Sequence, residues 1–147
     1  MPVSHDPHPD SVDLAYRGAA DLAADLDSGR TTSVEVVRSL LERIEAVDGP
    51  DGIDLRAVVA VSPRALDEAA RLDAERVEGS VRSPLHGVPV LVKDNIEALG
   101  LPGTAGSMAL HGRTVERDAP LVMRLRDAGL VVLGSTNLSE WANLRSS

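Results

Sequence analysis

The sequence predicts an α/β domain, and two features of the chain carry that prediction. Short runs rich in β-branched residues alternate with segments that have the apolar spacing of amphipathic helices; the runs cover residues 57–61, 88–92 and 130–133. The last two runs flank a glycine-rich loop and a helical segment, which is the βαβ order. Because βαβ connections join parallel strands, we expect these two strands to be neighbours or near neighbours in one sheet.

The first third of the chain predicts a tail and two helices. Residues 1–10 hold three prolines and two histidines, a composition typical of a disordered or loosely docked tail. From Ser11 onward apolar residues recur at spacings of three and four, and Gly29 is suited to end that helix. The segment T-S-V-E at 32–35 has the form of a capping box, and it predicts a second amphipathic helix that ends at Gly49.

Two further helices are predicted between and after the strands. Ser62 is expected to cap a helix that runs to about Val77, with Pro63 at its first position. Asp118 is expected to cap a helix over 119–128, and a helix or turn should follow the third strand. The glycine-rich segment 100–107 should be a loop.

Composition excludes several classes of function. The chain has 147 residues, the length of one ordinary domain, and 43% of them are apolar. A net charge of -8 argues against nucleic acid as a partner, and Tyr16 and Trp141 as the only aromatic residues offer no platform for base stacking. The chain has no cysteine, and no apolar run is long enough for a signal peptide or a membrane helix. We expect a cytoplasmic protein without membrane contact; homo-oligomers remain possible.

Common catalytic and cofactor motifs are absent. The glycines at 100, 103 and 106 do not match G-x-G-x-x-G, and no G-x-S-x-G nucleophile elbow occurs. His5 and His8 lack supporting ligands, while His86 and His111 each precede a glycine, which is typical of turns. No metal and no cofactor is therefore expected. A nucleotide-binding α/β domain is one further hypothesis, and saturable binding of ATP or NAD would support it.

Lys93 is the strongest candidate for a catalytic residue. It is the only lysine among 15 basic residues, and it follows the apolar run at 88–92 directly. Arginine stays protonated, whereas a desolvated lysine can lose its proton and act as a base. The structural alternative is a surface lysine or an ion-pair partner of Asp94. The position after a buried strand favours the base.

Polar residues near the same sheet edge complete a partial site. Asn137 follows the third strand as Lys93 follows the second, and sites in α/β sheets lie at the carboxyl ends of strands. A neutral lysine can activate a serine hydroxyl, so the arrangement suits acyl transfer, although no serine is clearly the nucleophile. We expect a supporting shell that orients Lys93, made of Asp94, Asn95, Thr104, Ser107 and Asn137.

Four linked motifs resemble the amidase signature family. They are H-G-V-P-V-L-V-K-D-N-I at 86–96, T-A-G-S at 104–107, D-A-P-L-V-M-R-L-R-D-A-G-L-V-V-L-G-S-T-N at 118–137 and N-L-S-E-W-A-N-L-R-S at 137–146. The resemblance runs from the early helices to the last residue and is densest from Pro84. One departure is Ser135, where family members often have lysine.

The resemblance implies a fold, a reaction and a catalytic residue. Such enzymes hydrolyse carboxylic amides with a Ser-cisSer-Lys triad, on a mixed central sheet flanked by helices, without metal or organic cofactor. The family's lysine falls on Lys93. Its two serines come from a Gly/Ser-rich segment downstream of the W-A-N-x-R-S region, so Ser146 and Ser147 are not assigned these roles. Residues 11–147 are then expected to be the N-terminal part of one catalytic domain, cut before that segment and inactive alone.

Other functions remain open at this point. The motif N-L-S-E-W favours a stand-alone amidase, acting on a small-molecule amide, over the glutamyl-tRNA amidotransferase A-type proteins, which tend towards N-M-D-E-F. A non-catalytic product, either a truncated remnant or a binding module, is the alternative from a different class. An incomplete sheet would leave an open edge and uncovered apolar surface.

Overall fold

A computed structural model describes residues 14–49, 51–113 and 115–143. The expected tail at 1–10 lies outside these residues. The helices and strands, with η for short 3₁₀ helices, follow in the order η1 (Leu14–Tyr16), α1 (Ala19–Asp27), α2 (Ser33–Asp48), β1 (Val58–Val61), α3 (Ala65–Val77), β2 (Pro89–Lys93), η2 (Met108–Leu110), α4 (Pro120–Asp127), β3 (Val131–Thr136) and η3 (Glu140–Ala142). No helix in this part of the chain is long and apolar enough to cross a membrane.

A three-stranded mixed sheet with the order β1-β3-β2 forms the centre of the fold. β2 and β3 are parallel and β1 is antiparallel to β3, which confirms both the predicted parallel pair and the mixed α/β class. β3 runs between the two other strands, and its residues 131–135 are all buried. Gly134 allows this close pairing, because a Cβ there would stand 2.3 Å from the carbonyl oxygen of Ala60 on β1.

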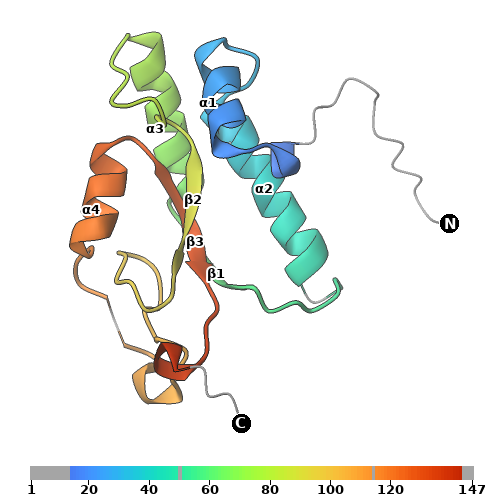
Figure 1. The fold of residues 1–147 in the computed structure, drawn as a ribbon, viewed down its shortest axis with the longest axis vertical. Helices are drawn as coiled ribbons and strands as arrows, with labels where there is room; N and C mark the ends of the chain where they lie inside the picture. The colour runs from blue at the N-terminus through green and yellow to red at the C-terminus, as the bar shows by residue number, and fades with distance from the viewer. Residues whose placement is uncertain (1–13, 50, 114, 144–147) are drawn as a thin grey trace, which may run out of the picture.

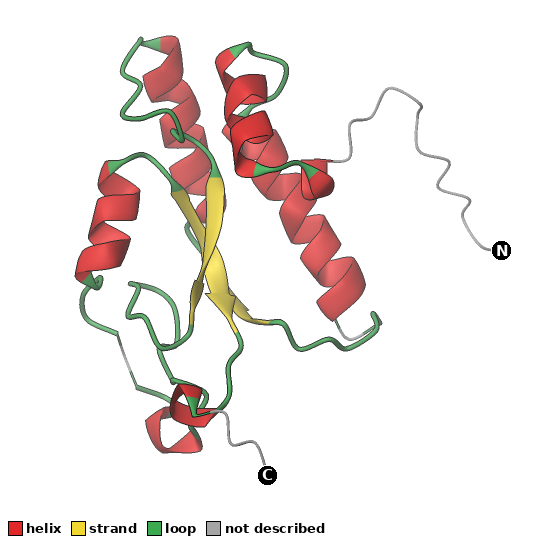
Figure 2. Cartoon of the chain, in the orientation of Figure 1, coloured by secondary structure: helices red, strands yellow, loops and turns green. Residues whose placement is uncertain are grey.

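Helices cover both faces of the sheet (Figures 1 and 2). On one face, α2 and α3 pack on β3 in a core of small and branched side chains: Val37, Ala65, Ala69, Leu72, Val131 and Leu133. On the other face, α4 and the loop after β2 pack on the same strand: Val92, Ala98, Leu101, Val122 and Val132. Alternate residues of β3 thus enter opposite cores, as the two-residue period of a strand requires.

The second helix begins as its capping box predicts. The Thr32 hydroxyl accepts a hydrogen bond from the Glu35 backbone N–H, and the Glu35 carboxylate accepts one from the Thr32 N–H. Asp73 on α3 adds a tertiary cap, because its two carboxylate oxygens accept from the backbone N–H groups of Ser33 and Val34 at 2.7 and 3.0 Å. The start of α2 is therefore held by both local and distant acceptors.

Three other helix starts differ from the prediction. The first predicted helix is interrupted, because Gly18 is extended and α1 begins only at Ala19, after the separate turn η1. α3 begins at Ala65, with Arg64 rather than Ser62 as its N-cap; the Ser62 hydroxyl accepts from Arg64 N–H. Asp118 does not cap α4, since its oxygens accept from the Leu99 backbone N–H and the Arg126 guanidinium.

Candidate active site

Lys93 is the last residue of β2, opposite Thr136 at the end of the parallel strand β3. This confirms its predicted place at the carboxyl end of the sheet. Among the described residues its side chain is exposed, although it directly follows a run that the sequence predicts to be a buried strand. β2 lies at the edge of the sheet, and no described strand pairs with its other side. No ion pair or hydrogen bond within the described chain engages the Lys93 ammonium.

Asp94, the next residue, is fully buried and holds the glycine-rich loop against the strand. One carboxylate oxygen accepts from Gly103 N–H at 3.0 Å, and the other accepts from the N–H and hydroxyl of Thr104 at 2.9 and 2.5 Å. Its backbone carbonyl accepts from Ala105 N–H, while its own N–H donates to Thr136. A single residue therefore joins the end of β3 to the loop that follows β2.

The glycine-rich loop is in turn joined to the segment after β3. Ser107 Oγ donates to the Glu140 carboxylate at 2.6 Å, and Trp141 N–H donates to the Ala105 carbonyl at 2.8 Å. Gly106 has a φ of +70°, and a Cβ there would lie 2.8 Å from the Leu138 carbonyl oxygen. A side chain at Gly106 would thus both strain the backbone and separate the two segments.

The structure places Asn137 in a different arrangement from the one we expected. Its side-chain amide donates to the Arg56 carbonyl at 2.9 Å, and its oxygen accepts from Leu138 N–H at 2.9 Å. The bond to Arg56 joins the segment before β1 to the residue that follows β3. Asn137 is exposed, so an orienting role towards Lys93 stays a prediction without a contact in its support.

Two further polar residues lie close to the lysine along the strands. Asn95 is exposed and lines a cavity beside the loop. Ser135 is 1% exposed and lies opposite Val92 in the register of β2 and β3. Its hydroxyl has no hydrogen-bond partner among the described residues. A lysine at this position would have to place an ammonium in the same buried space.

The described residues bring an exposed lysine to the end of β2, and no hydroxyl group of the expected supporting shell is paired with it. The Thr104 hydroxyl is bonded to Asp94, and the Ser107 hydroxyl is bonded to Glu140, so neither is paired with Lys93. The same part of the chain contains no cluster of three or more histidine, aspartate or glutamate side chains that could hold a metal ion. Chemically, the site is an exposed amine at the end of a strand, next to a loop fixed by a buried carboxylate.

Sequence reasoning assigned no role in the site to Glu140 and Trp141, which the structure brings to this loop, or to Ala105 within it. Glu140 and Trp141 contact the loop from more than 30 positions further along the chain, and Ala105 accepts the bond from Trp141. Spacing gives no sign of such long-range pairs. Trp141 alone carried a signal, since it is one of two aromatic residues in the chain.

Comparison with known proteins finds relatives over most of this chain. A peptide amidase from Stenotrophomonas maltophilia has the same fold over 88% of this chain, with 52% identity and a TM-score of 0.84, and 26% of that chain is covered. The A component of glutamyl-tRNA(Gln) amidotransferase from Thermobifida fusca is 43% identical over 132 residues, which are 89% of this chain and 26% of the relative. A putative amidase of Schizosaccharomyces pombe is 41% identical over 123 residues, 83% of this chain and 20% of the relative.

These matches cover most of this chain but only a small part of each relative. The chain spans about a quarter of the length of the proteins that it matches. The sequence model of the Amidase family matches residues 35–147, which include most of α2, all of α3 and the whole sheet. The chain therefore belongs to the amidase signature family.

Proposed function

We propose that this chain supplies the lysine base of an amidase that hydrolyses linear carboxylic amides. The observation that carries the proposal is the position of Lys93: the chain's only lysine ends the parallel strand β2, within a fold shared with a peptide amidase. Residues 11–147 then form the N-terminal part of one catalytic domain. The Gly/Ser-rich segment with the two serines belongs to the remainder of that domain.

In this proposal Lys93 moves one proton in two directions. By family resemblance, the neutral amine takes a proton, through a bridging serine, from the serine whose oxygen attacks the amide carbonyl carbon. The same proton passes to the nitrogen as the C–N bond breaks, and ammonia or an amine leaves. A water molecule then attacks the acyl-serine ester, which releases the carboxylic acid and returns the proton to the serine oxygen. Asp94 acts here as a positioning residue, since it fixes the loop beside the lysine.

The exposure of Lys93 is consistent with a site that is completed by further chain. An amine loses its proton near neutral pH only when desolvation or a neighbouring charge disfavours the ammonium. β2 offers a free edge next to Lys93, and we propose that the remainder of the domain covers this edge and the lysine with it. The proposal thus assigns the 147-residue chain no turnover of its own.

The coding DNA beyond codon 147 is the first test. If the frame continues into a Gly/Ser-rich segment, the complete product is assayed on a simple amide together with Lys93→Ala and Lys93→Arg. Both variants should lose about 100- to 10,000-fold in kcat, since arginine keeps the charge but cannot serve as a base. Full activity of either variant would overturn the role of Lys93. A stop codon directly after codon 147 would favour the non-catalytic alternative.

A second candidate follows from the relatives. The Thermobifida fusca protein is one component of an amidotransferase, and its 43% identity keeps that function open for this chain. The motif N-L-S-E-W at 137–141 favours the stand-alone amidase. Hydrolysis of a simple amide by the complete product in the absence of any other polypeptide distinguishes the two functions.

A further inference from the structure

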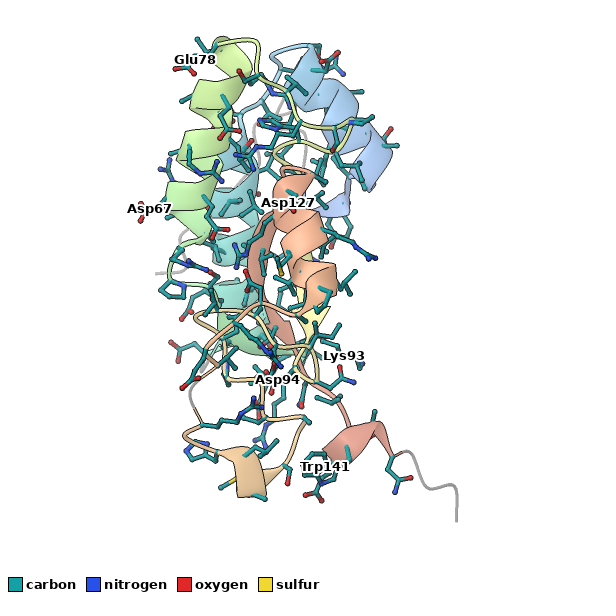
Figure 3. All side chains as sticks on the ribbon, turned by 90° about the vertical axis from the view of Figure 1, so that its left-hand side faces the viewer. Asp67, Glu78, Lys93, Asp94, Asp127 and Trp141 are labelled. Atoms are coloured by element: carbon teal, nitrogen blue, oxygen red, sulfur yellow. The ribbon has the colours of Figure 1, made fainter. Side chains whose placement is uncertain are left out.

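A cavity of about 620 Å³ lies beyond the carboxyl end of the sheet, next to the loop that Asp94 holds. Figure 3 shows Trp141 on the same side of the molecule as Lys93 and Asp94, further from the helices α1 and α3. The cavity walls come from the loop after β2, the glycine-rich loop, η2 with the residues that follow it, the start of α4 and η3. The larger side chains are those of Asn95, Ile96, Glu97, Leu110, Arg113, Leu121 and Trp141. This volume falls within the usual range of small-molecule sites.

The chemistry of the walls favours a neutral, apolar ligand. Aliphatic and aromatic side chains predominate, and Asn95 offers an exposed side-chain amide only two residues after Lys93. The two charged side chains of the lining, Arg113 and Glu97, form an ion pair with each other, and Arg117 lies 3.8 Å from the same carboxylate. The hydrogen bond from Arg113 lowers the pKa of the Glu97 carboxyl, with a smaller contribution from the charge of the same guanidinium, so the pair stays ionised at neutral pH.

Two residues of the cavity lining have a left-handed backbone, a conformation that Asp54 and Arg56 also adopt in the segment before β1. Ala105 and Trp141 both have left-handed φ values, of 51° and 55°, and Trp141 N–H donates to the Ala105 carbonyl at 2.8 Å. Non-glycine residues in this conformation cost roughly 1–2 kcal/mol each and gather at functional sites. The tryptophan side chain remains 58% exposed, so the strain is not offset by its burial in the core.

We propose that this cavity binds the apolar side chain of a neutral amide substrate, with the indole of Trp141 as one wall and the Asn95 amide as a hydrogen-bonding group. The proposal rests on the proposed amidase function and names a substrate class for it. A branched alkyl or phenyl group fits the apolar walls, while a free carboxylate would compete with the Glu97 carboxylate for Arg113.

The chain itself contains the reporter for the test. Trp141 is its only tryptophan, so intrinsic indole fluorescence follows this cavity alone. N-acetyl-L-phenylalaninamide should cause a saturable change in emission, with a Kd on the order of 1 mM for a ligand of this size. N-acetylglycinamide, which lacks the apolar group, and the free acid N-acetyl-L-phenylalanine should bind at least about 10-fold more weakly, a difference of about 1.4 kcal/mol.

Two substitutions on α4 form a matched pair. Leu121 lines the cavity and is 50% exposed, whereas Met123 is 54% exposed and is not part of its lining. Leu121→Asp should abolish the saturable response, and Met123→Asp should keep it. The proposal is overturned if the amide gives no saturation, if both variants respond equally, or if the free acid binds as tightly as the amide.

Failure of this inference can be told from failure of the amidase proposal. Lys93-dependent hydrolysis by the complete product, without binding of the amide probe at Trp141, would overturn the cavity and leave the amidase function standing. Saturable binding by the chain, combined with a complete product whose amide hydrolysis does not depend on Lys93, would overturn the lysine's role alone.

Discussion

Two buried aspartates show how differently the two ends of this molecule are stabilised. Asp25 on α1 is 4% exposed and accepts hydrogen bonds from the guanidinium groups of Arg17 and Arg30. Asp94 after β2 is 0% exposed and accepts from Gly103 N–H and from both donors of Thr104. Among the described residues, Asp94 forms no ion pair. Asp25 is thus stabilised by two cationic side chains, whereas Asp94 is stabilised by uncharged hydrogen-bond donors of the glycine-rich loop.

The difference separates a packing role from a positioning role. The Asp25 cluster joins a helix to the residues around it, and its long side chains could adopt other geometries with little change in the backbone. At Asp94 two of the three donors are backbone N–H groups, so the carboxylate dictates where Gly103 and Thr104 lie. A buried carboxylate whose donors are amides needs those amides in place, because an unpaired buried charge is strongly unfavourable. The loop beside Lys93 is thereby held rigid.

The largest effect is expected from Asp94→Ala. The change leaves Gly103 N–H and Thr104 N–H without acceptors, and each buried orphan costs about 1–3 kcal/mol. Asp94→Asn keeps one oxygen but turns an NH₂ group towards a backbone donor, so its loss should be intermediate. Urea unfolding monitored by circular dichroism measures both, and hydrogen exchange of the loop amides should accelerate in the same order.

Asp127→Ala provides the control for this pair, because Asp127 is an exposed residue at the end of α4 (Figure 3). Its unfolding midpoint should stay close to that of the unchanged chain. Loop amides that exchange at the same rate in Asp94→Ala as in the unchanged chain would show that the carboxylate does not hold the loop.

Much of the frame could be predicted from the sequence because its signals are local. Helix α2 follows a capping box at 32–35, and the parallel pair β2 and β3 follows from the βαβ order. The errors at the starts of α3 and α4 are of one kind, because Ser62 and Asp118 have side chains that can cap a helix but bind other groups. Ser62 accepts from Arg64 N–H in a turn before α3, and Asp118 accepts from the distant Leu99 N–H. Capping propensity does not register such competition.

The site could be predicted only in part. Composition and strand position located Lys93, and adjacency alone suggested Asp94. The bonds from Ser107 to Glu140 and from Trp141 to Ala105 join segments more than 30 residues apart, and no periodicity encodes them. The exposure of Lys93 also escaped prediction, because an apolar run indicates a strand without telling whether that strand lies at a sheet edge.

A smaller effect is expected at Asp25, where it takes the form of a pH dependence. The hydrogen bond from Arg30 lowers the pKa of the Asp25 carboxyl below its ordinary 3.8, with a further lowering by Arg17 and an opposing increase from burial. A lowered folded-state pKa means that the folded chain binds fewer protons than the unfolded chain. This stabilisation is complete above the unfolded pKa and is lost as the pH falls through the folded one. Asp25→Asn should therefore flatten the acid side of the curve of stability against pH.

The smallest effect in this comparison should come from the two arginines taken one at a time. Arg30 is the first cause of the low Asp25 pKa, although its side chain is 62% exposed, against 33% for Arg17. Arg30→Gln should raise the Asp25 pKa more than Arg17→Gln does, as measured by NMR titration of the carboxyl carbon. Arg30 donates two hydrogen bonds to Asp25 and Arg17 donates one. A larger increase of the Asp25 pKa in Arg17→Gln would show that burial of the arginine matters more than the number of its hydrogen bonds. Asp25 keeps one guanidinium partner in either variant. The loss of stability should therefore stay well below that in Asp94→Ala, where the N–H groups of Gly103 and Thr104 both lose their acceptor.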